Sequence, residues 1–557
     1  MKLCLRFLLF LGGWLLAAPA AWASHALGGQ ITYQYVGTPA QPNLYRVTCR
    51  MFRDCSGIAA STSLTLNCRV GTPTTSCNSN DPRNFSTTLT AGLVTIGAPY
   101  CASAGNACSA GGRPNYETTK YEAVVTLPPA AWTLSVSENA RPALANITGT
   151  SQDLYLEATL NNQITLASGA TQTVNNTSPQ YLDQNVPIPF VCTQQRTTLS
   201  FATFEPDGDS LVYSLDRALE GCNQPMTYKT FVNGAVDIFP TNPPCVLMLA
   251  AGTGTAYSPT FPIPSFDITG SCPVKIAVPS FRFTPATGSV TFTPYYYDPA
   301  NAASNKYSVV GKVTEYRRLN GRYYQVGSVR RDMIVIVTDC GNNQVPNLPS
   351  IAGAPTDTIV VQGPVMAYTT ASFTLSDPNP SDQLTVTFGL PADQDYLSLY
   401  VDPTAPNVPI SVTGNGTAAP VLQVRLRPES TLLGRTFRIP VRVEDNACPL
   451  RGVQNFVVVL RTVAARPLAV AGGRPRATLS AFPNPFTEQV SFTVPRPRGT
   501  QVVLIHDQLG REVARLPVPA GTGTEATLTW MPAAALPAGV YTARAAEGGP
   551  AVRLLRR

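Results

Sequence analysis

Short segments in which apolar and polar residues alternate recur along most of this 557-residue chain. The stretches LYRVTCRMFRDC (44–55), DLYLEATL (153–160) and RDMIVIVTDC (331–340) are examples. A repeat of two residues matches a strand, because successive side chains of a strand point to opposite faces. Outside residues 1–23 we find no helical apolar period longer than two turns. The sequence therefore predicts an all-β protein.

Composition agrees with this prediction. Charged residues are 13% of the chain, and 51 prolines and 41 glycines accompany many threonines, serines and asparagines. This mixture favours strands and turns over surface helices. The formal net charge of +7 is spread thinly, with no basic stripe interleaved with aromatics. We therefore expect no nucleic-acid partner.

The length predicts several domains. Residues 24–343 read as a cysteine-rich succession of strands, which we expect to form two β-sandwich units with a boundary near 190–200. Residues 351–463 contain about seven strand segments, the size and rhythm of an immunoglobulin-like or cadherin-like β-sandwich. A linker at 464–477 precedes a small last module at 478–557. The predicted architecture is multidomain, with β-sandwiches throughout.

The first residues predict export. Lys2 and Arg6 flank the start of an apolar run at 7–21, and Ala21-Trp22-Ala23 supplies the small residues that a signal peptidase reads. We expect a signal peptide at 1–23, cleaved after Ala23. No later segment has the roughly 20 uninterrupted apolar residues that span a bilayer, so no transmembrane helix is expected in the mature chain.

The cysteines predict disulfides. The chain has 13, and removal of Cys4 with the signal peptide leaves an even number, 12, in an oxidising setting. Zinc is disfavoured, because there is no C-x2-C unit and the chain has only two histidines. Cys68–Cys77 and Cys101–Cys108 are the local pairs expected first. The disulfide candidates are Cys49, Cys55, Cys68, Cys77, Cys101, Cys108, Cys192, Cys222, Cys245, Cys272, Cys340 and Cys448.

One candidate cation site lies in FEPDGDSLVYSL. Glu205, Asp207 and Asp209 alternate around a glycine turn, and carboxylate oxygens in such a loop are ligands that Ca²⁺ prefers. The cluster lacks the remaining ligands of a twelve-residue calcium loop. The alternative interpretation is an Asp-Gly turn that leads into a strand.

A second candidate cation site combines two loops of the segment 351–463. Cadherin-type modules bind calcium with acidic loop clusters of this kind, whereas the alternative is a pair of solvated loops between strands. Calcium is the sole cofactor that we consider. The residues expected to meet are Asp377, Asn379 and Asp382 in one loop and Glu444, Asp445 and Asn446 in the other.

Catalytic motifs are missing from the sequence. It has no G-x-S-x-G, H-E-x-x-H or G-x-x-x-x-G-K-[ST] pattern, and the two histidines, His25 and His506, lie outside the main body. We therefore predict that the protein is not an enzyme. A carboxylate pair for glycoside hydrolysis stays open, because the fold assembles such pairs. The alternative function is thus a secreted carbohydrate-active hydrolase or a carbohydrate-binding protein.

The region 24–343 resembles the N-terminal region of large secreted proteins of gliding Bacteroidota, of the gliding motility-associated or adhesin-like kind. The resemblance implies an extracellular β-rich module and brings no catalytic residues. Arg141-Pro142 stands where those proteins have an Arg-Asn pair, so a role tied to that pair does not carry over. The matching stretches are SHALGGQITYQYVG, YRVTCRMFRDCSG, LYLEATLNN, NNTSPQYLDQNVPIPFVC, FEPDGDSLVYSL and GSVRRDMIVIVTDCGNN.

The region 478–557 resembles the C-terminal sorting domain of type IX secretion cargo. It contains AFPNPF, then VVLIHDQLGREV, then LPAGVYTARA, and it ends on basic VRLLRR. The alternative is an ordinary last β domain with no address function. The motif residues are Pro483, Asn484, Pro485, Asp507, Gly510, Gly539 and Tyr541.

These features together predict a non-enzymatic adhesin or structural interaction module. It would pass through the periplasm and reach the outer cell surface or the medium. The expected partners are the type IX secretion machinery and a surface polysaccharide or protein ligand.

Overall fold

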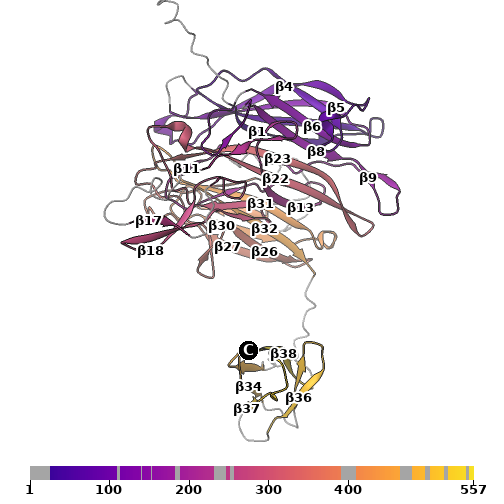
Figure 1. Ribbon diagram of the computed structural model, residues 1–557, viewed down its shortest axis with the longest axis vertical. Coiled ribbons are helices and arrows are strands. Elements are labelled where there is room, and N and C mark those ends of the chain that lie inside the picture. Colours follow the sequence, from indigo (N-terminus) through magenta and orange to yellow (C-terminus); the bar gives the residue numbers. More distant parts are fainter. Residues whose placement is uncertain are drawn as a thin grey trace, which may run out of the picture. The chain divides into compact units, whose positions relative to one another are not determined.

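The computed structural model describes most of the chain (Figure 1). The predicted signal peptide, Cys4, Cys245 and nearly all of the predicted linker at 464–477 lie outside the described residues. The chain divides into two compact units, residues 1–465 and 466–557, which we describe separately. The described ranges are 26–108, 113–139, 141–151, 153–181, 188–230, 246–250, 256–389, 409–464, 479–495, 502–519, 525–546 and 551–557.

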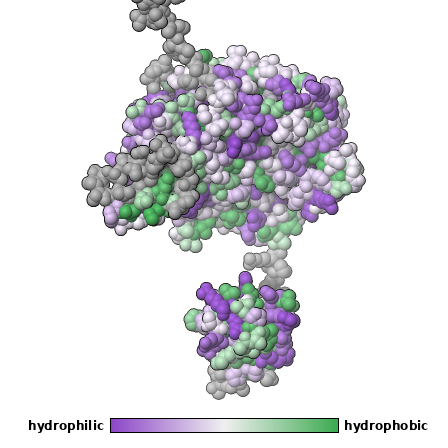
Figure 2. Space-filling view, in the orientation of Figure 1, coloured by the Kyte–Doolittle hydropathy of each residue, from purple (hydrophilic) through white to green (hydrophobic). Residues whose placement is uncertain are grey.

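The all-β prediction is confirmed. Among the described residues the helical elements are short 3-10 turns, and none of them is long and apolar enough to cross a membrane. Hydrophilic and hydrophobic residues are interspersed over the visible face of each unit (Figure 2). The turns are η1 (Ser76–Asn78), η2 (Ala102–Ala104), η3 (Ala302–Asn305) and η5 (Ser430–Leu432).

One large sheet dominates the first unit, and its indigo strands gather together in Figure 1. Its members are β1 (Ala26–Tyr35), β2 (Leu44–Asp54), β3 (Ser63–Val70), β4 (Phe85–Ile96), β5 (Tyr116–Thr126), β6 (Ala131–Glu138), β8 (Leu154–Asn161), β11 (Phe190–Cys192), β13 (Ser210–Asp216), β22 (Lys306–Leu319) and β23 (Arg322–Thr338). The order is β1-β2-β5-β4-β3-β6-β8-β23-β22-β13, and β11 also pairs with β23.

Strand β23 closes this sheet on itself. It pairs with β22 along one edge, and along the other edge it pairs in succession with β8, β1 and β11. Strands from both sides of residues 190–200 therefore share one sheet. The predicted boundary there is wrong for the sheet, because the long β22–β23 hairpin returns to the first strands. The turn of this hairpin lies at Asn320-Gly321, where both φ angles are positive, as such a tight turn requires.

The interior of the closed sheet is the largest core. It follows the predicted alternation: Val47 and Cys49 point inward, whereas Arg46 and Arg50 do not belong to the core. Its largest fully buried side chains include Trp132 and several tyrosines. The apolar period of two therefore marks the inward face correctly.

Small sheets complete the body of the first unit. They support a second apolar core, to which Phe266, Phe292 and Tyr307 belong. These strands are β7 (Ile147–Thr148), β9 (Gln163–Thr165), β10 (Thr171–Thr173), β12 (Thr197–Ser200), β14 (Leu219–Gly221), β15 (Gln224–Pro225), β16 (Thr227–Tyr228), β17 (Val246–Leu249), β18 (Phe266–Ser271), β19 (Val274–Pro279), β20 (Arg282–Thr284) and β21 (Ser289–Phe292).

The segment 351–463 forms the predicted β-sandwich. One layer has the order β26-β32-β31-β28 and the other β27-β30-β29, and their apolar faces enclose a separate core. The strands are β26 (Thr358–Pro364), β27 (Thr369–Thr374), β28 (Thr385–Phe388), β29 (Ile410–Thr413), β30 (Val421–Leu426), β31 (Thr436–Glu444) and β32 (Val453–Val463), preceded by β24 (Ser350–Ile351) and β25 (Ala354–Pro355).

The sandwich is joined to the body by backbone and buried amide contacts. Gln454 Oε1 accepts from the Thr198 N–H at 2.6 Å, and Asn455 Nδ2 donates to the Thr198 carbonyl at 3.0 Å. Tyr100 and Leu450 form a β-bridge, beside which the disulfide Cys101–Cys448 links the two parts covalently. Body and sandwich therefore belong to one compact unit.

The prediction that the chain forms disulfides is confirmed, whereas the two predicted local pairs are wrong. The bonds are Cys55–Cys108, Cys77–Cys222, Cys101–Cys448 and Cys192–Cys340, and Cys272 is also disulfide-bonded. The pairs Cys68–Cys77 and Cys101–Cys108 are not formed, because the fold brings other cysteines together. Cys49 and Cys68 are free thiols buried in the core of the closed sheet. Burial raises the pKa of both thiols, which keeps them protonated.

The second unit is a small β-sandwich, as predicted. Its layers have the orders β33-β34-β37 and β36-β35-β38-β39, and Phe492, Trp530 and Tyr541 lie in its core. The strands are β33 (Ser480–Phe482), β34 (Val490–Pro495), β35 (Val502–Asp507), β36 (Glu512–Pro517), β37 (Glu525–Trp530), β38 (Gly539–Ala545) and β39 (Val552–Arg556).

Candidate functional site

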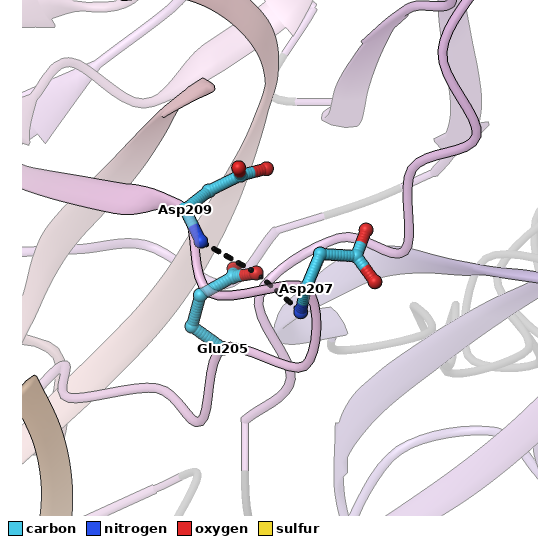
Figure 3. Close-up of side chains that lie close together, drawn as sticks. All are labelled: Glu205, Asp207 and Asp209. Carbon is cyan, nitrogen blue, oxygen red and sulfur yellow. Dashed lines mark hydrogen bonds between the residues drawn. The ribbon is translucent and has the colours of Figure 1, made fainter. Parts of the chain in front are cut away.

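The first acidic cluster forms in the turn before β13, as the sequence predicts. Carboxylate oxygens of Glu205, Asp207 and Asp209 lie within 4.8 Å of one another. Glu205 Oε1 accepts from the backbone N–H of Asp207 at 2.8 Å and of Asp209 at 3.5 Å (Figure 3). Gly208 has a φ of 80°, a conformation that favours glycine. The turn and the cluster are thus the same structure.

Arg317 of β22 neutralises two of these carboxylates. Its Nη2 donates to Asp207 Oδ2 at 2.7 Å and to Asp209 Oδ2 at 2.8 Å, and its Nε donates to Asp209 Oδ1 at 2.9 Å. The Arg317 side chain is 18% exposed, so these charge-assisted bonds are largely shielded from water. A guanidinium therefore holds the place that calcium would need. The residues do not fit a calcium ion here.

Glu205 is half-buried, and the neighbouring Glu315 is fully buried. Burial, reinforced by the charges of Asp209 and Asp207, raises the pKa of Glu205 to about 8. Burial and the charge of Glu205 also raise the pKa of Glu315, whose Oε1 accepts from the Tyr33 hydroxyl at 2.9 Å. The Oε2 atoms of both glutamates are buried without a described hydrogen-bond partner. Glu205 is therefore mainly protonated at neutral pH.

The second acidic cluster also forms, between two loops at one end of the sandwich. Carboxylate oxygens of Asp377, Asp382 and Asp445 lie within 4.8 Å of one another. Asp445 is 2% exposed, and its Oδ1 accepts from the backbone N–H groups of Ala447 and Gly452, both at 2.9 Å. These bonds fix one carboxylate in place between the loops.

The junction between body and sandwich contributes to this second cluster. Asn343 Nδ2 donates to Asp445 Oδ2 at 3.0 Å, and the Asn343 Oδ1 atom is buried without a described partner. Asp377 Oδ1 accepts from the Asn379 N–H at 2.7 Å, whereas Asp377 Oδ2 is likewise buried and unpartnered. One buried amide oxygen, of Asn343, and one buried carboxylate oxygen, of Asp377, thus have no described donor.

No described lysine or arginine forms an ion pair with Asp377, Asp382 or Asp445. Burial, together with the charges of Asp445 and Asp382, raises the pKa of Asp377 to about 6, although the Asn379 N–H opposes this rise. Uncompensated carboxylates that share a shielded site are the donor set that a hard divalent cation prefers. This cluster therefore fits calcium, in contrast to the first.

The other predicted members of the second cluster are engaged elsewhere. Glu444 pairs with Arg442, Asn446 Oδ1 accepts from the Gln383 N–H at 2.8 Å, and Asn379 Oδ1 accepts from the Gln344 N–H at 2.9 Å. Sequence reasoning missed Arg317, Glu315 and Asn343. Their positions in the chain give no local signal, since each reaches its cluster through long-range folding.

In the second unit, Asn484 ties the PNP segment to the last strand. Its Nδ2 donates to the Arg553 carbonyl at 2.7 Å, and its Oδ1 accepts from the Leu555 N–H at 2.9 Å. The peptide bonds before Pro483 and Pro485 are cis. The predicted motif therefore holds β39 in place together with the pairing of β39 with β38.

The other motif residues lie close to the same strand, because Asp507 pairs with Tyr541 of β38 and Tyr541 pairs with Leu554 of β39. Asp507 Oδ1 accepts from the N–H groups of Leu509 and Arg511, at 2.9 and 3.0 Å, in a tight turn that joins β35 to β36. Gly510 has a φ of 80° in this turn. The Tyr541 hydroxyl donates to the Pro537 carbonyl at 2.6 Å. Asp507, Tyr541 and Gly539 line a cavity of about 340 Å³, beside the exposed Leu509.

Comparisons with known proteins give little. No family model matches the chain, and no curated protein matches it. Similar solved structures include an endo-fucoidan hydrolase of glycoside hydrolase family 107, at 11% identity and a TM-score of 0.15, over 69% of this chain and 40% of that one. The EC1–3 fragment of mouse clustered PcdhgC3 is 10% identical with a TM-score of 0.15, and the match covers 61% of this chain and 78% of that one. The ectodomain of mouse nectin-like molecule 4 is 12% identical with a TM-score of 0.13, and the match covers 67% of this chain and 97% of that one. Similarity at this level carries no functional argument.

Proposed function

We propose that this protein is a non-enzymatic interaction module that is exported to the cell surface or the medium. The observation that supports this most directly is the division of the chain into two compact units. Body and sandwich are locked together into one unit, whereas the motif-bearing C-terminal module is a compact unit of its own. Such an arrangement suits a stable binding unit and a sorting module that can be removed from it.

The disulfides favour an oxidising compartment. Four bonds link positions between 53 and 347 residues apart, so they constrain the whole first unit. Disulfides of this kind persist in exported proteins and are rare in reducing cytosol. They support passage through the periplasm to the outside.

The C-terminal module is proposed to be read by the type IX secretion machinery. Its predicted motif residues are not scattered: Asn484 fixes the basic last strand, and Asp507, Gly539 and Tyr541 surround one cavity. This arrangement supports an address function, in addition to the order of the motifs in the sequence.

A polar groove is the proposed ligand-binding surface of the first unit. It encloses about 710 Å³ beside the junction of body and sandwich, and amide side chains dominate its lining. Amides both donate and accept hydrogen bonds, which suits the hydroxyl groups of a surface polysaccharide. Among its lining residues are Gln194, Gln195, Asn342, Gln344 and Asn347.

Calcium is proposed to bind at Asp377, Asp382 and Asp445. The ion would cross-link the loops of the sandwich to Asn343, whose segment joins the body to the sandwich. Binding there would stiffen the wall of the polar groove, because Asn343 also lines it.

The export proposal is tested in a host that has type IX secretion. Deletion of residues 478–557 is expected to leave the protein in the periplasm. In the full chain, Asp507→Ala removes the acceptor that organises the turn, and we expect it to reduce surface delivery. Thr527→Ala, at an exposed position of β37 outside the lining of the cavity at Asp507, is the control. Normal delivery of the truncated protein would rule out the address function.

A further inference from the structure

A partly open cavity lies where the body meets the sandwich, and its lining includes Glu444, the residue before Asp445 of the second acidic cluster. Its volume is about 110 Å³. Phe190, Leu199 and Met333 of the body form an apolar wall, and β31 and β32 of the sandwich supply the opposite wall. None of the predicted functions uses this cavity.

The cavity is held in shape by covalent and backbone contacts. The Cys101 N–H donates to the Pro449 carbonyl at 3.0 Å, and the Arg451 N–H donates to the Pro99 carbonyl at 3.1 Å. The disulfide Cys101–Cys448 lies in the same pair of segments. A cavity walled in this way is pre-formed, which lowers the free-energy cost of ordering the protein around a ligand.

The polar wall carries two guanidinium groups and one carboxylate. Arg442 hydrogen-bonds to Glu444, and Arg451 Nη1 lies 3.7 Å from the same carboxylate oxygen. The remaining bonds of Arg451 go to the Tyr100 carbonyl, from Nε at 3.1 Å and from Nη2 at 2.8 Å. Burial raises the pKa of Tyr116 in this lining to about 12, so its hydroxyl is neutral. The charged groups of the lining therefore sum to one excess positive charge.

Arg442 has donor capacity that no described group satisfies. Its Nε is buried and has no hydrogen-bond partner, and its side chain is 19% exposed. A largely shielded guanidinium that shares its only described carboxylate with a second guanidinium is under-compensated. A single added negative charge would balance the site, whereas a dianion would be opposed by Glu444.

We propose that this cavity binds a small monocarboxylate with a short aliphatic chain. The carboxylate would accept hydrogen bonds from the Arg442 and Arg451 guanidinium groups, and the chain would pack against Leu199 and Met333. The size of the cavity limits the ligand, since an engineered cavity of about 150 Å³ holds benzene, to about six non-hydrogen atoms. Butyrate has the matching charge, length and polarity.

The test measures binding of butyrate to the full mature chain by titration calorimetry, with its neutral amide as the comparison ligand. Butyrate is expected to bind saturably, and butyramide at least about tenfold more weakly, because it cannot balance the guanidinium charge. Arg442→Met is expected to weaken butyrate binding by about tenfold or more. Arg461→Gln removes an exposed arginine from β32 and is expected to change nothing.

Val453→Phe keeps every charge and fills the cavity from the sandwich side, so it guards against an unfolded Arg442 variant. We expect it to abolish butyrate binding while the melting temperature stays near that of the unsubstituted protein. Equal binding of butyramide and butyrate would overturn the proposal, as would unchanged butyrate binding in the Val453→Phe protein. Failure to saturate at any accessible butyrate concentration would overturn it as well.

Discussion

The two acidic clusters look alike in the sequence and differ in the structure. Each brings three carboxylates within 4.8 Å of one another. At Glu205, Asp207 and Asp209, the guanidinium of Arg317 supplies the compensating charge. At Asp377, Asp382 and Asp445, no described basic side chain does so. A cluster of carboxylates therefore indicates that a cation lies nearby. The rest of the fold determines whether this cation is a basic side chain of the protein or a bound metal ion.

This difference separates structure from function within one unit. The first cluster is a closed network that ties the turn before β13 to the β22–β23 hairpin through bonds across 108 positions of the chain. The second lies at the junction of body and sandwich, where an exogenous ion would change how firmly loops are held. We therefore assign the first cluster to stability and propose the second for calcium.

The largest effect is expected from Arg317→Met. This change leaves Asp207 and the 4% exposed Asp209 without their counter-charge, and breaking such a shielded pair costs on the order of 3–5 kcal/mol. Urea denaturation measures the free energy of unfolding. Arg318→Met, at the exposed neighbouring position of the same strand, is the control and should cost little. Equal losses in both variants would show that Arg317 does not close the first cluster.

A pH dependence should follow from Glu205, which faces Asp207, Asp209, Glu315 and Arg317. Its pKa is about 8 in the folded protein and near 4.5 when unfolded. The folded state therefore holds an extra proton between these values, and stability should fall as pH rises through this window, by up to about 1.4 kcal/mol per pH unit.

Glu205→Gln removes this proton uptake. We expect the variant to match the unsubstituted protein near pH 4.5 and to exceed its stability at pH 8, with a residual slope from Glu315. Unfolding free energies measured across this range provide the check. Parallel pH profiles of the two proteins would contradict a protonated Glu205.

At the second cluster we expect a smaller change in the free energy of unfolding, opposite in sign to that of Arg317→Met. Without calcium, Asp377→Asn removes one of three neighbouring negative charges and should stabilise the protein by about 1 kcal/mol at neutral pH. Because the pKa of Asp377 is about 6, calcium affinity in the unsubstituted protein should also fall as pH drops through that value. Titration calorimetry at two pH values measures this, and a pH-independent affinity would speak against Asp377 as a ligand.

The sequence predicted the strands well and their long-range connections poorly. Alternation identified the inward face of β2, and it already placed Cys49 beside Val47 and Met51 on the apolar side, a signal for a buried free thiol. The disulfide pairs could not be predicted, because Cys101 and Cys448 are 347 positions apart. Closure of the large sheet by β23 is a similar long-range event.

The candidate sites show the same limit. The acidic residues were found because each loop carries its carboxylates close together in the chain. Whether Asp377 and Asp445 would meet depended on the sandwich, whose predicted size and strand rhythm were correct. Arg317 could not be assigned to Asp209, since an arginine in an alternating strand is usually a solvated side chain. The partner that decides the chemistry was therefore invisible to local reasoning.

The claim that the two clusters differ is tested most directly by melting the protein with and without calcium. With excess calcium we expect the unsubstituted protein and Glu205→Gln to melt several degrees higher than in a chelator, because the ion binds the folded state alone. Asp377→Asn should lose most of this shift. An unchanged melting temperature, or a shift that Glu205→Gln abolishes and Asp377→Asn retains, would contradict the account.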